Sequence, residues 1–251
     1  MRFVARPSKQ FLFDRLESHL KHFSGSVGLD VGSADFKNRY MVKTGKYYGL
    51  DRRLPLIQKG LARYSGPDTI GILADFTQLD ALRSNSVDVV VSTNALHQLD
   101  PESRKQGLAH LCRLTVPTGY LFVEVSIGQD FDALNRIVRG TFKAIKVRYY
   151  KNALSQAYES IFERDGNLGS SSRILRLMSW GISRFEYLTQ FTRFGNQHAF
   201  IVATGKSGER QDLEFDVANP PRFDSIESRR ARFDSRLSAR RADSRIIKLS
   251  P

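Results

Sequence analysis

The sequence predicts an α/β fold, namely a doubly wound, mostly parallel sheet of seven strands that is closed by an antiparallel hairpin. Two observations carry this prediction. Short apolar runs alternate with helical patterns along the first half of the chain, and the connections are long enough for the crossovers that parallel neighbours need. With 251 residues, 41% of them hydrophobic, the chain can also bury a sizeable core.

The first half contains the regular elements. A helix is expected over residues 8–23, because Phe13, Leu16, Leu20 and Phe23 recur at helical spacing. The predicted strands cover residues 26–31, 47–50, 69–74, 87–92 and 120–125. The predicted helices between them cover residues 36–44, 54–64, 79–83 and 101–114. The segment Val116-Pro117-Thr118-Gly119 is expected to break the chain before the fifth strand.

The second half is expected to add a lid and a hairpin. Residues 130–180 are helical in pattern and rich in Arg, Lys and Tyr, which predicts a helical insertion after the fifth strand. Residues 185–193 and 198–204 are predicted as a hairpin with a loop over 194–197. The domain is therefore assigned to residues 1–205, and the Arg/Ser/Asp-rich residues 206–251 are expected to form a flexible tail.

Composition narrows the class of protein. The single cysteine, Cys112, excludes an internal disulfide framework, and no metal-ligand spacing is present. No uninterrupted apolar run reaches about 18 residues, so a cytoplasmic protein without a transmembrane segment is expected. Most of the net charge of +13 lies outside the tail. A basic surface favours partners that carry phosphate, so nucleic acid is kept as an alternative partner. Surface lysines and arginines more often serve only to keep a face of the protein solvated.

Two carboxylates mark the ends of predicted strands. Val27-Gly28-Leu29-Asp30-Val31-Gly32-Ser33 ends a strand at a tight turn, where backbone N–H groups are free to meet a ligand. Asp51 ends the next strand about twenty residues later, at the spacing where a doubly wound sheet places an acid on ribose hydroxyls. A nucleotide-type cofactor is the first hypothesis. A nicotinamide dehydrogenase is disfavoured, because Gly28 and Gly32 do not have the G-x-G-x-x-G spacing.

Residues 25–125 resemble the class I S-adenosylmethionine-dependent methyltransferases, which have a Rossmann-like fold. The resemblance rests on the segment from Asp30 to Phe36, on Asp75-Phe76 after the third strand, on the Asn94-Ala95-Leu96-His97 segment, and on a Leu-x-Pro-Gly-Gly-like turn at 114–120. Ala34 and Phe36 stand where the family often has further glycines.

The resemblance implies S-adenosyl-L-methionine as cofactor and assigns roles to single residues. Asp51 would take the ribose hydroxyls, Asp75 and Phe76 the adenine, and Asn94 the methionine moiety. The full set of expected cofactor-binding residues is Asp30, Gly32, Ser33, Asp51, Arg52, Asp75, Phe76 and Asn94.

The expected reaction is in-line methyl transfer to a small molecule, sugar or biosynthetic intermediate. Because the sulfonium is already activated, alignment supplies most of the gain, and a base is needed only if the acceptor keeps its proton. His97 is the first candidate for that base and Glu124 the second. Methylation of RNA or protein, and an inactive binding or scaffold protein, are the alternatives. Tyr149, Tyr150, Tyr158, Phe162 and Trp180 either stack a substrate or, as the favoured interpretation, form the core of the insertion.

Overall fold

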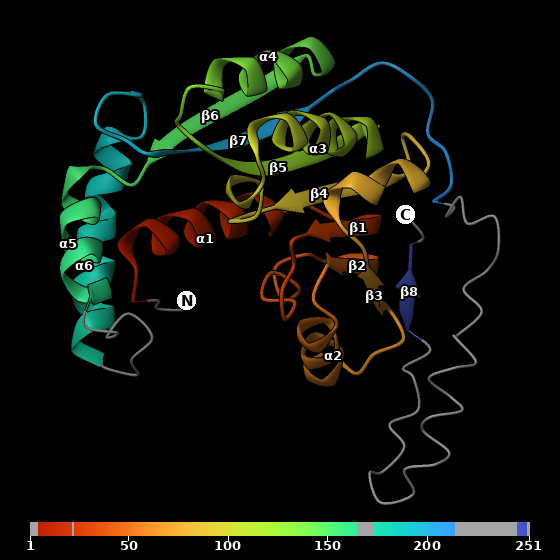
Figure 1. Ribbon diagram of the computed structural model, residues 1–251, viewed down its shortest axis with the longest axis horizontal. Coiled ribbons are helices and arrows are strands. Elements are labelled where there is room, and N and C mark those ends of the chain that lie inside the picture. The colour runs from red at the N-terminus through yellow and green to blue at the C-terminus, as the bar shows by residue number, and fades with distance from the viewer. Residues whose placement is uncertain (1–4, 22, 165–172, 214–244, 250–251) are drawn as a thin grey trace, which may run out of the picture.

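The computed structural model describes residues 5–21, 23–164, 173–213 and 245–249. They form an eight-stranded sheet with the order β6-β7-β5-β4-β1-β2-β3-β8 (Figure 1). Within it only β7 is antiparallel to its neighbours, so the expectation of a mostly parallel sheet is confirmed. The strands are β1 Gly25–Val31, β2 Thr44–Asp51, β3 Thr69–Leu73, β4 Val87–Ser92, β5 Thr115–Ser126, β6 Ala144–Tyr150, β7 His198–Thr204 and β8 Ile246–Lys248.

Helices cover both faces of the sheet, as a doubly wound fold requires. The α-helices are α1 Pro7–Leu20, α2 Leu54–Arg63, α3 Pro101–Leu114, α4 Phe131–Thr141, α5 Ala153–Arg164 and α6 Arg173–Thr189. Two 3-10 helices, η1 Phe76–Ala81 and η2 Leu96–Gln98, follow β3 and β4. The apolar residues of α3 and α4 pack on one face of the sheet, and those of α1 and α2 pack on the other.

The predicted hairpin is wrong in its first strand. Residues 185–189 belong to the end of α6. On the side away from β5, β7 pairs with β6, a strand from within the predicted insertion. In β6 the outward-facing residues include Lys146 and Arg148, and charged side chains are common on edge strands. Because these basic residues interrupt the apolar run, the strand was not predicted.

Two shorter expectations also need correction. Residues 32–41 form consecutive turns rather than a helix, with positive φ angles at Gly32, Ala34 and Phe36. The fully buried ring of Phe36 lies against Gly49 of β2 and Gly60 of α2. A helix predicted at 79–83 is instead η1. The expected break at 116–119 is a shift of register between β4 and β5, since β5 begins at Thr115 directly after α3.

Part of the segment predicted as a flexible tail belongs to the sheet. Ile246, Ile247 and Lys248 pair in parallel with Gly71, Ile72 and Leu73, which gives the sheet its eighth strand. Before that, Lys206 donates to the carbonyl groups of Cys112 and Arg113 at 2.8 Å. Residues 214–244 of the predicted tail lie outside the described residues.

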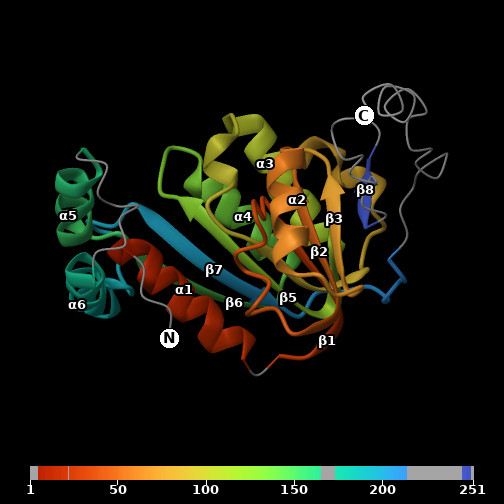
Figure 2. The same cartoon turned by 90° about the horizontal axis from the view of Figure 1, so that it is seen from below.

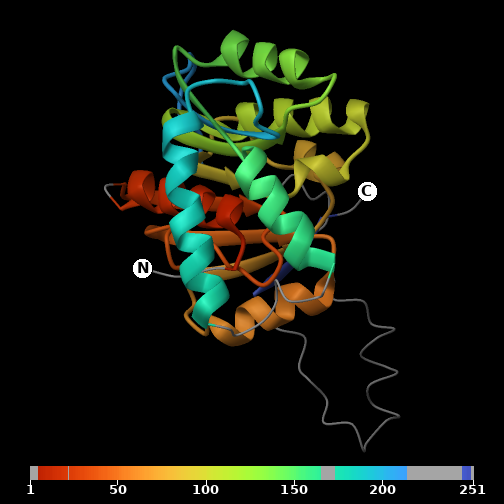
Figure 3. The same ribbon diagram turned by 90° about the vertical axis from the view of Figure 1, so that its left-hand side faces the viewer.

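The insertion itself is the helix pair α5 and α6, between β6 and β7. Figures 1 and 2 place the two helices beyond the N-terminal end of α1, and Figure 3 shows them in front of the sheet edge. Tyr150 and Tyr158 are buried, in agreement with the interpretation of these rings as core. Across the described residues, we find no helix whose length and apolar character would suffice for a membrane span.

Candidate cofactor-binding site

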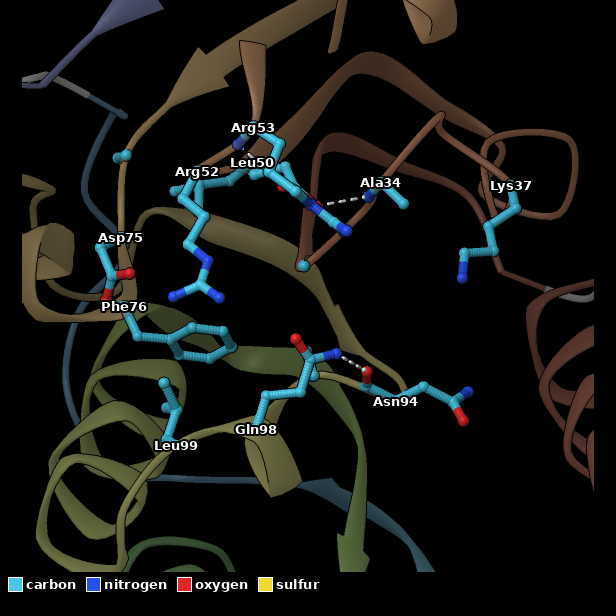
Figure 4. A pocket seen from close by; sticks show the side chains of 14 residues that line it. Ala34, Lys37, Leu50, Arg52, Arg53, Asp75, Phe76, Asn94, Gln98 and Leu99 are labelled. Carbon is cyan, nitrogen blue, oxygen red and sulfur yellow. Dashed lines mark hydrogen bonds and ion pairs between the residues drawn. The ribbon is translucent and has the colours of Figure 1, made fainter. Parts of the chain in front are cut away.

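A pocket of about 590 Å³ opens at the carboxyl ends of β1 to β4 (Figure 4). Six of the eight residues predicted to bind a cofactor line it, and they are Gly32, Asp51, Arg52, Asp75, Phe76 and Asn94. Further lining residues that the prediction missed include Ala34, Lys37, Arg53, Gln98 and Leu99. The structure therefore gathers most of the predicted set around one hollow.

The loop after β1 forms one wall of the pocket. Gly32 has a φ of +74°, and a Cβ built on it would stand 2.3 Å from Cβ of Ala95, so only glycine fits there. Ala34 and Phe36 have φ angles of 50° and 57°. The chain thus has left-handed backbone at the two positions where the resemblance leads us to expect glycine, and it carries there side chains that strain that conformation.

The strain at Ala34 is expected to be measurable. Ala34→Gly removes a left-handed cost of about 1–2 kcal/mol and adds a backbone-entropy cost of about 0.5–1 kcal/mol. We therefore expect the free energy of unfolding, measured by urea denaturation, to rise by about 0–1.5 kcal/mol. Phe36→Gly is the contrasting variant and should destabilise, because the loss of a buried ring outweighs relief of the same strain. A destabilised Ala34→Gly variant would contradict this account of the loop.

Asp51 lies at the end of β2 with its side chain 4% exposed. Its Oδ2 accepts from the backbone N–H of Ala34 at 2.9 Å, and its Oδ1 accepts from Nε of Arg53 at 3.1 Å. The Arg53 side chain is 55% exposed, so it can leave the carboxylate without being buried unpaired. The only sequence signal for Arg53 was that it follows Asp51 by two residues.

Asp75 and Phe76 form the opposite wall, in the segment after β3. Figure 4 shows the ring of Phe76 between Leu99 and the guanidinium of Arg52. The backbone N–H of Asp75 donates to Oε1 of Gln78 at 2.7 Å, which fixes the turn into η1. An apolar ring beside a carboxylate and a guanidinium suits a flat, polar-edged ligand.

Asp30 and Ser33, by contrast, do not line the pocket. Asp30 points to the α1 and α2 face of the sheet, where Tyr47 donates to it at 2.8 Å and Asn38 at 3.2 Å. Ser33 is fully buried, and its hydroxyl donates to the carbonyl of Leu50 at 3.2 Å. In this structure both side chains hold the loop against β2.

Burial raises the pKa of Asp30 to about 6, although the hydrogen bonds from Tyr47 and Asn38 act in the opposite direction. Because the folded pKa lies above the unfolded value of 3.8, ionisation costs stability as the pH rises from about 4 to above 6. A pKa raised by about two units means that ionised Asp30 lowers the free energy of unfolding by about 3 kcal/mol. Replacing Asp30 by a neutral asparagine would regain this amount, less about 1 kcal/mol for one weaker hydrogen bond.

Asp30→Asn is therefore expected to raise the free energy of unfolding by about 2 kcal/mol at pH 8. At pH 4 the gain should vanish, because Asp30 is then protonated in the folded protein. Urea denaturation at both pH values measures the difference, and Asp132→Asn, which changes an exposed carboxylate, is the control. A loss of stability at pH 8 would contradict the assignment of Asp30 as a buried, destabilised anion.

The two predicted catalytic residues lie next to the pocket, not in its lining. Oε2 of Glu124 accepts from the backbone N–H of Asn94 at 2.6 Å, and Oε1 lies 2.5 Å from Nδ1 of His198. Burial opposes ionisation of Glu124, but contacts with His198, Asn94 and His97 together lower its pKa. Burial lowers the pKa of His97, whose ring centroid lies 6.5 Å from that of His198.

His198 was missed in the sequence, because it is adjacent to Glu124 only through the pairing of β7 with β5. Its register partner is Ser126, two residues after Glu124 on the same face. With Nδ1 bonded to a carboxylate, the imidazole presents Nε2 as its remaining polar atom.

Comparisons with known proteins identify a matching domain and a shared fold. Residues 29–123 match the family model of the methyltransferase domain. An uncharacterized methyltransferase of Bacillus cytotoxicus is 25% identical over 154 residues, which cover 58% of this chain and 70% of the relative.

Two solved structures share the fold. One is a SAM-dependent methyltransferase from Archaeoglobus fulgidus, with a TM-score of 0.50 and 17% identity over 78% of this chain and 94% of that one. The other is phosphoethanolamine N-methyltransferase 2 of Haemonchus contortus, in complex with phosphomonomethylethanolamine and S-adenosylhomocysteine. It has a TM-score of 0.51 and 13% identity over 79% of this chain, and the chain spans only 53% of its length.

Residues 29–123 therefore match a methyltransferase domain, and the sheet around them has the fold of the SAM-dependent methyltransferase from Archaeoglobus fulgidus. The chain is thus identified as a methyltransferase through this segment.

Proposed function

We propose that the enzyme transfers the methyl group of S-adenosylmethionine to a small-molecule or glycan acceptor. We further propose that the pocket of Figure 4 holds this cofactor. Asp51 would accept from the two ribose hydroxyls, since a carboxylate offers two acceptors to paired donors. Asp75 would accept from the adenine amine and Phe76 would cover the ring. Gly32 and Asn94 would flank the methionine end. When bound, the cofactor supplies an activated methyl group.

The observation that carries this proposal is the buried carboxylate of Asp51 on the wall of the pocket, opposite Asp75 and Phe76. In the structure the half-exposed guanidinium of Arg53 donates to the carboxylate of Asp51. A ribose would replace the Arg53 side chain while the backbone bond from Ala34 stays in place.

For the acceptor's proton we propose the cluster of His97, Glu124 and His198. The lowered pKa of His97 keeps its imidazole neutral at pH 7, the form that accepts a proton. Both oxygens of Glu124 already have partners, so Glu124 would act by holding His198 and Asn94 in position. A proton leaving a hydroxyl or amine acceptor would go to an imidazole nitrogen of His97 or His198.

The net charge of +13 favours a second candidate, methylation of RNA. Phosphate contacts would make retention on RNA fall steeply with salt, whereas a small-molecule enzyme should show little retention at physiological salt. A cytoplasmic location remains a prediction from the sequence.

Calorimetric titration with S-adenosylhomocysteine tests the assignment of the cofactor site. Asp51→Ala is expected to weaken binding by about 1–3 kcal/mol, which is a factor of about 5 to 150 in Kd, through lost charge-assisted hydrogen bonds. Asp132→Ala, which removes an exposed carboxylate paired with Arg193, should leave the affinity unchanged. Equal affinity of wild type and Asp51→Ala would remove Asp51 from the site.

A further inference from the structure

The pocket at the carboxyl edge of the sheet has a basic end. Lys37, from the turns after β1, lines the pocket. Figure 4 shows Lys37 together with Asn94 at the end of the pocket that lies opposite Phe76. The backbone N–H of Asn94 donates to Glu124 at 2.6 Å. This end of the pocket therefore adjoins the side chains that we propose for the acceptor's proton.

The first turn of α1 brings a second lysine, Lys9, to the same place. On α1 the ring of Phe11 stacks on Tyr150 with 5.6 Å between the ring centroids, and the centroid of Tyr150 lies 5.5 Å from that of His198. Burial lowers the pKa of His97 most, and the nearby ammonium group of Lys9 adds to this lowering. The start of α1 is thus a neighbour of both histidines.

The charges around the partly buried Lys9 are mainly positive. Burial lowers the pKa of Lys9 most, and repulsion by Lys37 and then by Arg6 lowers it further. The attraction by Glu159 and by Glu124 is weaker than either repulsion. Lysine side chains are rarely buried without a partner, because a desolvated ammonium group costs free energy. Two ammonium groups that repel each other in this way favour an anion as their common ligand.

The two carboxylates nearby already have partners. Glu124 accepts from Asn94 and contacts Nδ1 of His198. Glu159 accepts from the hydroxyl of Ser8 at 2.5 Å and pairs with Lys151 at 3.8 Å. Within the part of the chain that the structure describes, neither of the two lysines forms an ion pair. Their counter-charge therefore has to come from a ligand.

We propose that Lys9 and Lys37 together bind an anionic group of the methyl acceptor, which is a carboxylate or a phosphate. The inference rests on the proposed function, which places the methyl end of the cofactor beside Asn94. An anion on the two lysines would orient the acceptor, so that its nucleophilic atom lies between that methyl group and the imidazoles of His97 and His198. Orientation of this kind supplies most of what methyl transfer needs from the protein.

This proposal narrows the class of acceptor. A neutral alcohol or sugar would leave both ammonium groups without a counter-charge in a partly desolvated place. A carboxylate or phosphate accepts charge-assisted hydrogen bonds from both of them. The acceptor is therefore expected to be an acidic small molecule or an acidic sugar.

The test is calorimetric titration of the full chain, saturated with S-adenosylhomocysteine, at constant ionic strength. Inorganic phosphate is the probe in one arm and acetate is the probe in the other. We expect at least one of these anions to bind the wild type. Tighter binding of phosphate would indicate an acceptor with a phosphate group, and tighter binding of acetate would indicate one with a carboxylate.

Single variants separate the two lysines from general attraction. Lys9→Gln and Lys37→Gln should each weaken anion binding at least about tenfold, because each removes a charge-assisted hydrogen bond. The control Lys43→Gln/Lys46→Gln removes two exposed lysines at the amino end of β2, and it should change anion binding by less than about twofold. Thermal unfolding of every variant, followed by circular dichroism, verifies that it is folded.

The affinity of Lys9→Gln for S-adenosylhomocysteine should equal that of the wild type, because Lys9 does not line the pocket of Figure 4. A weakened affinity in this folded variant would assign Lys9 to the cofactor and overturn the proposal.

Three further results would also overturn it. The first is that neither anion binds the wild type. The second is undiminished anion binding in a folded Lys9→Gln or Lys37→Gln variant. The third is an equal loss in the control variant, which would show attraction to the basic surface alone. Because S-adenosylhomocysteine is added first, a wild type that does not bind it contradicts the proposed function, whereas a wild type that binds it but neither anion contradicts this proposal alone.

Discussion

Replacing Gly32 by alanine is expected to remove detectable binding of S-adenosylhomocysteine and to lower the free energy of unfolding by about 2–5 kcal/mol. The left-handed backbone at φ +74° costs an alanine about 1–2 kcal/mol. The new Cβ would also stand 2.3 Å from Cβ of Ala95, and such overpacking typically costs about 1–3 kcal/mol. Relief requires the loop after β1 to separate from the segment after β4, and these two segments form one side of the pocket.

Gly195→Ala is the matched control for this prediction. Gly195 has a φ of +75°, yet a Cβ built on it meets nothing within 4 Å. The control therefore isolates the backbone cost of about 1–2 kcal/mol and should leave the affinity for S-adenosylhomocysteine unchanged. Urea denaturation and calorimetry measure the two quantities. If both variants lose the same stability and both retain the affinity, the contact of Gly32 with Ala95 has no role in shaping the pocket.

The second large effect is expected for Glu124→Ala, which should lower the free energy of unfolding by about 3 kcal/mol at pH 7. The variant leaves the half-buried N–H of Asn94 and Nδ1 of His198 without their partner. Unsatisfied buried groups of this kind cost about 1–3 kcal/mol each. Since Asn94 holds a φ of 56° at the edge of the pocket, we also expect weaker binding of the cofactor product.

The pH dependence distinguishes this effect from a simple loss of packing. The folded pKa of Glu124 lies below the unfolded value of 4.5, so its contribution is present above about pH 4.5 and is lost as the pH falls through the folded pKa. The difference between wild type and Glu124→Ala should therefore shrink in acid. Glu102→Ala, which removes an exposed carboxylate paired with Lys105, is expected to change stability by less than about 0.5 kcal/mol. A pH-independent loss in Glu124→Ala would contradict the assignment of Glu124 as an ionised carboxylate.

Local patterns in the sequence were sufficient for the parts of the site that follow a strand directly. Asp51 and Asp75-Phe76 come at the ends of apolar runs, and parallel strands bring those ends to one edge of the sheet. Asp30 does not line the pocket, because successive side chains of a strand point to opposite faces of the sheet. Leu29 and Val31 face the α3 and α4 side, so Asp30 must face the other.

Features that depend on pairing between distant segments were not predictable in this way. His198 meets Glu124 only through the antiparallel register of β7 with β5. The edge strand β6 carries basic side chains, and β8 is only three residues long, so neither has the apolar pattern of a central strand. The insertion was predicted as helical, but which side of α6 faces outward depends on the polar surface of α1 against which it packs.

The central claim is that the carboxyl edge of β1 to β4 holds an adenosyl group between Asp51 on one side and Asp75 and Phe76 on the other. A crystal structure of the full chain with S-adenosylhomocysteine tests it most directly. The account predicts density for the ribose within hydrogen-bond distance of the Asp51 carboxylate, with Arg53 displaced from it and adenine beside Phe76. Density for the ligand at any other place on the molecule, or Arg53 still bonded to Asp51 beneath a bound ligand, would contradict it.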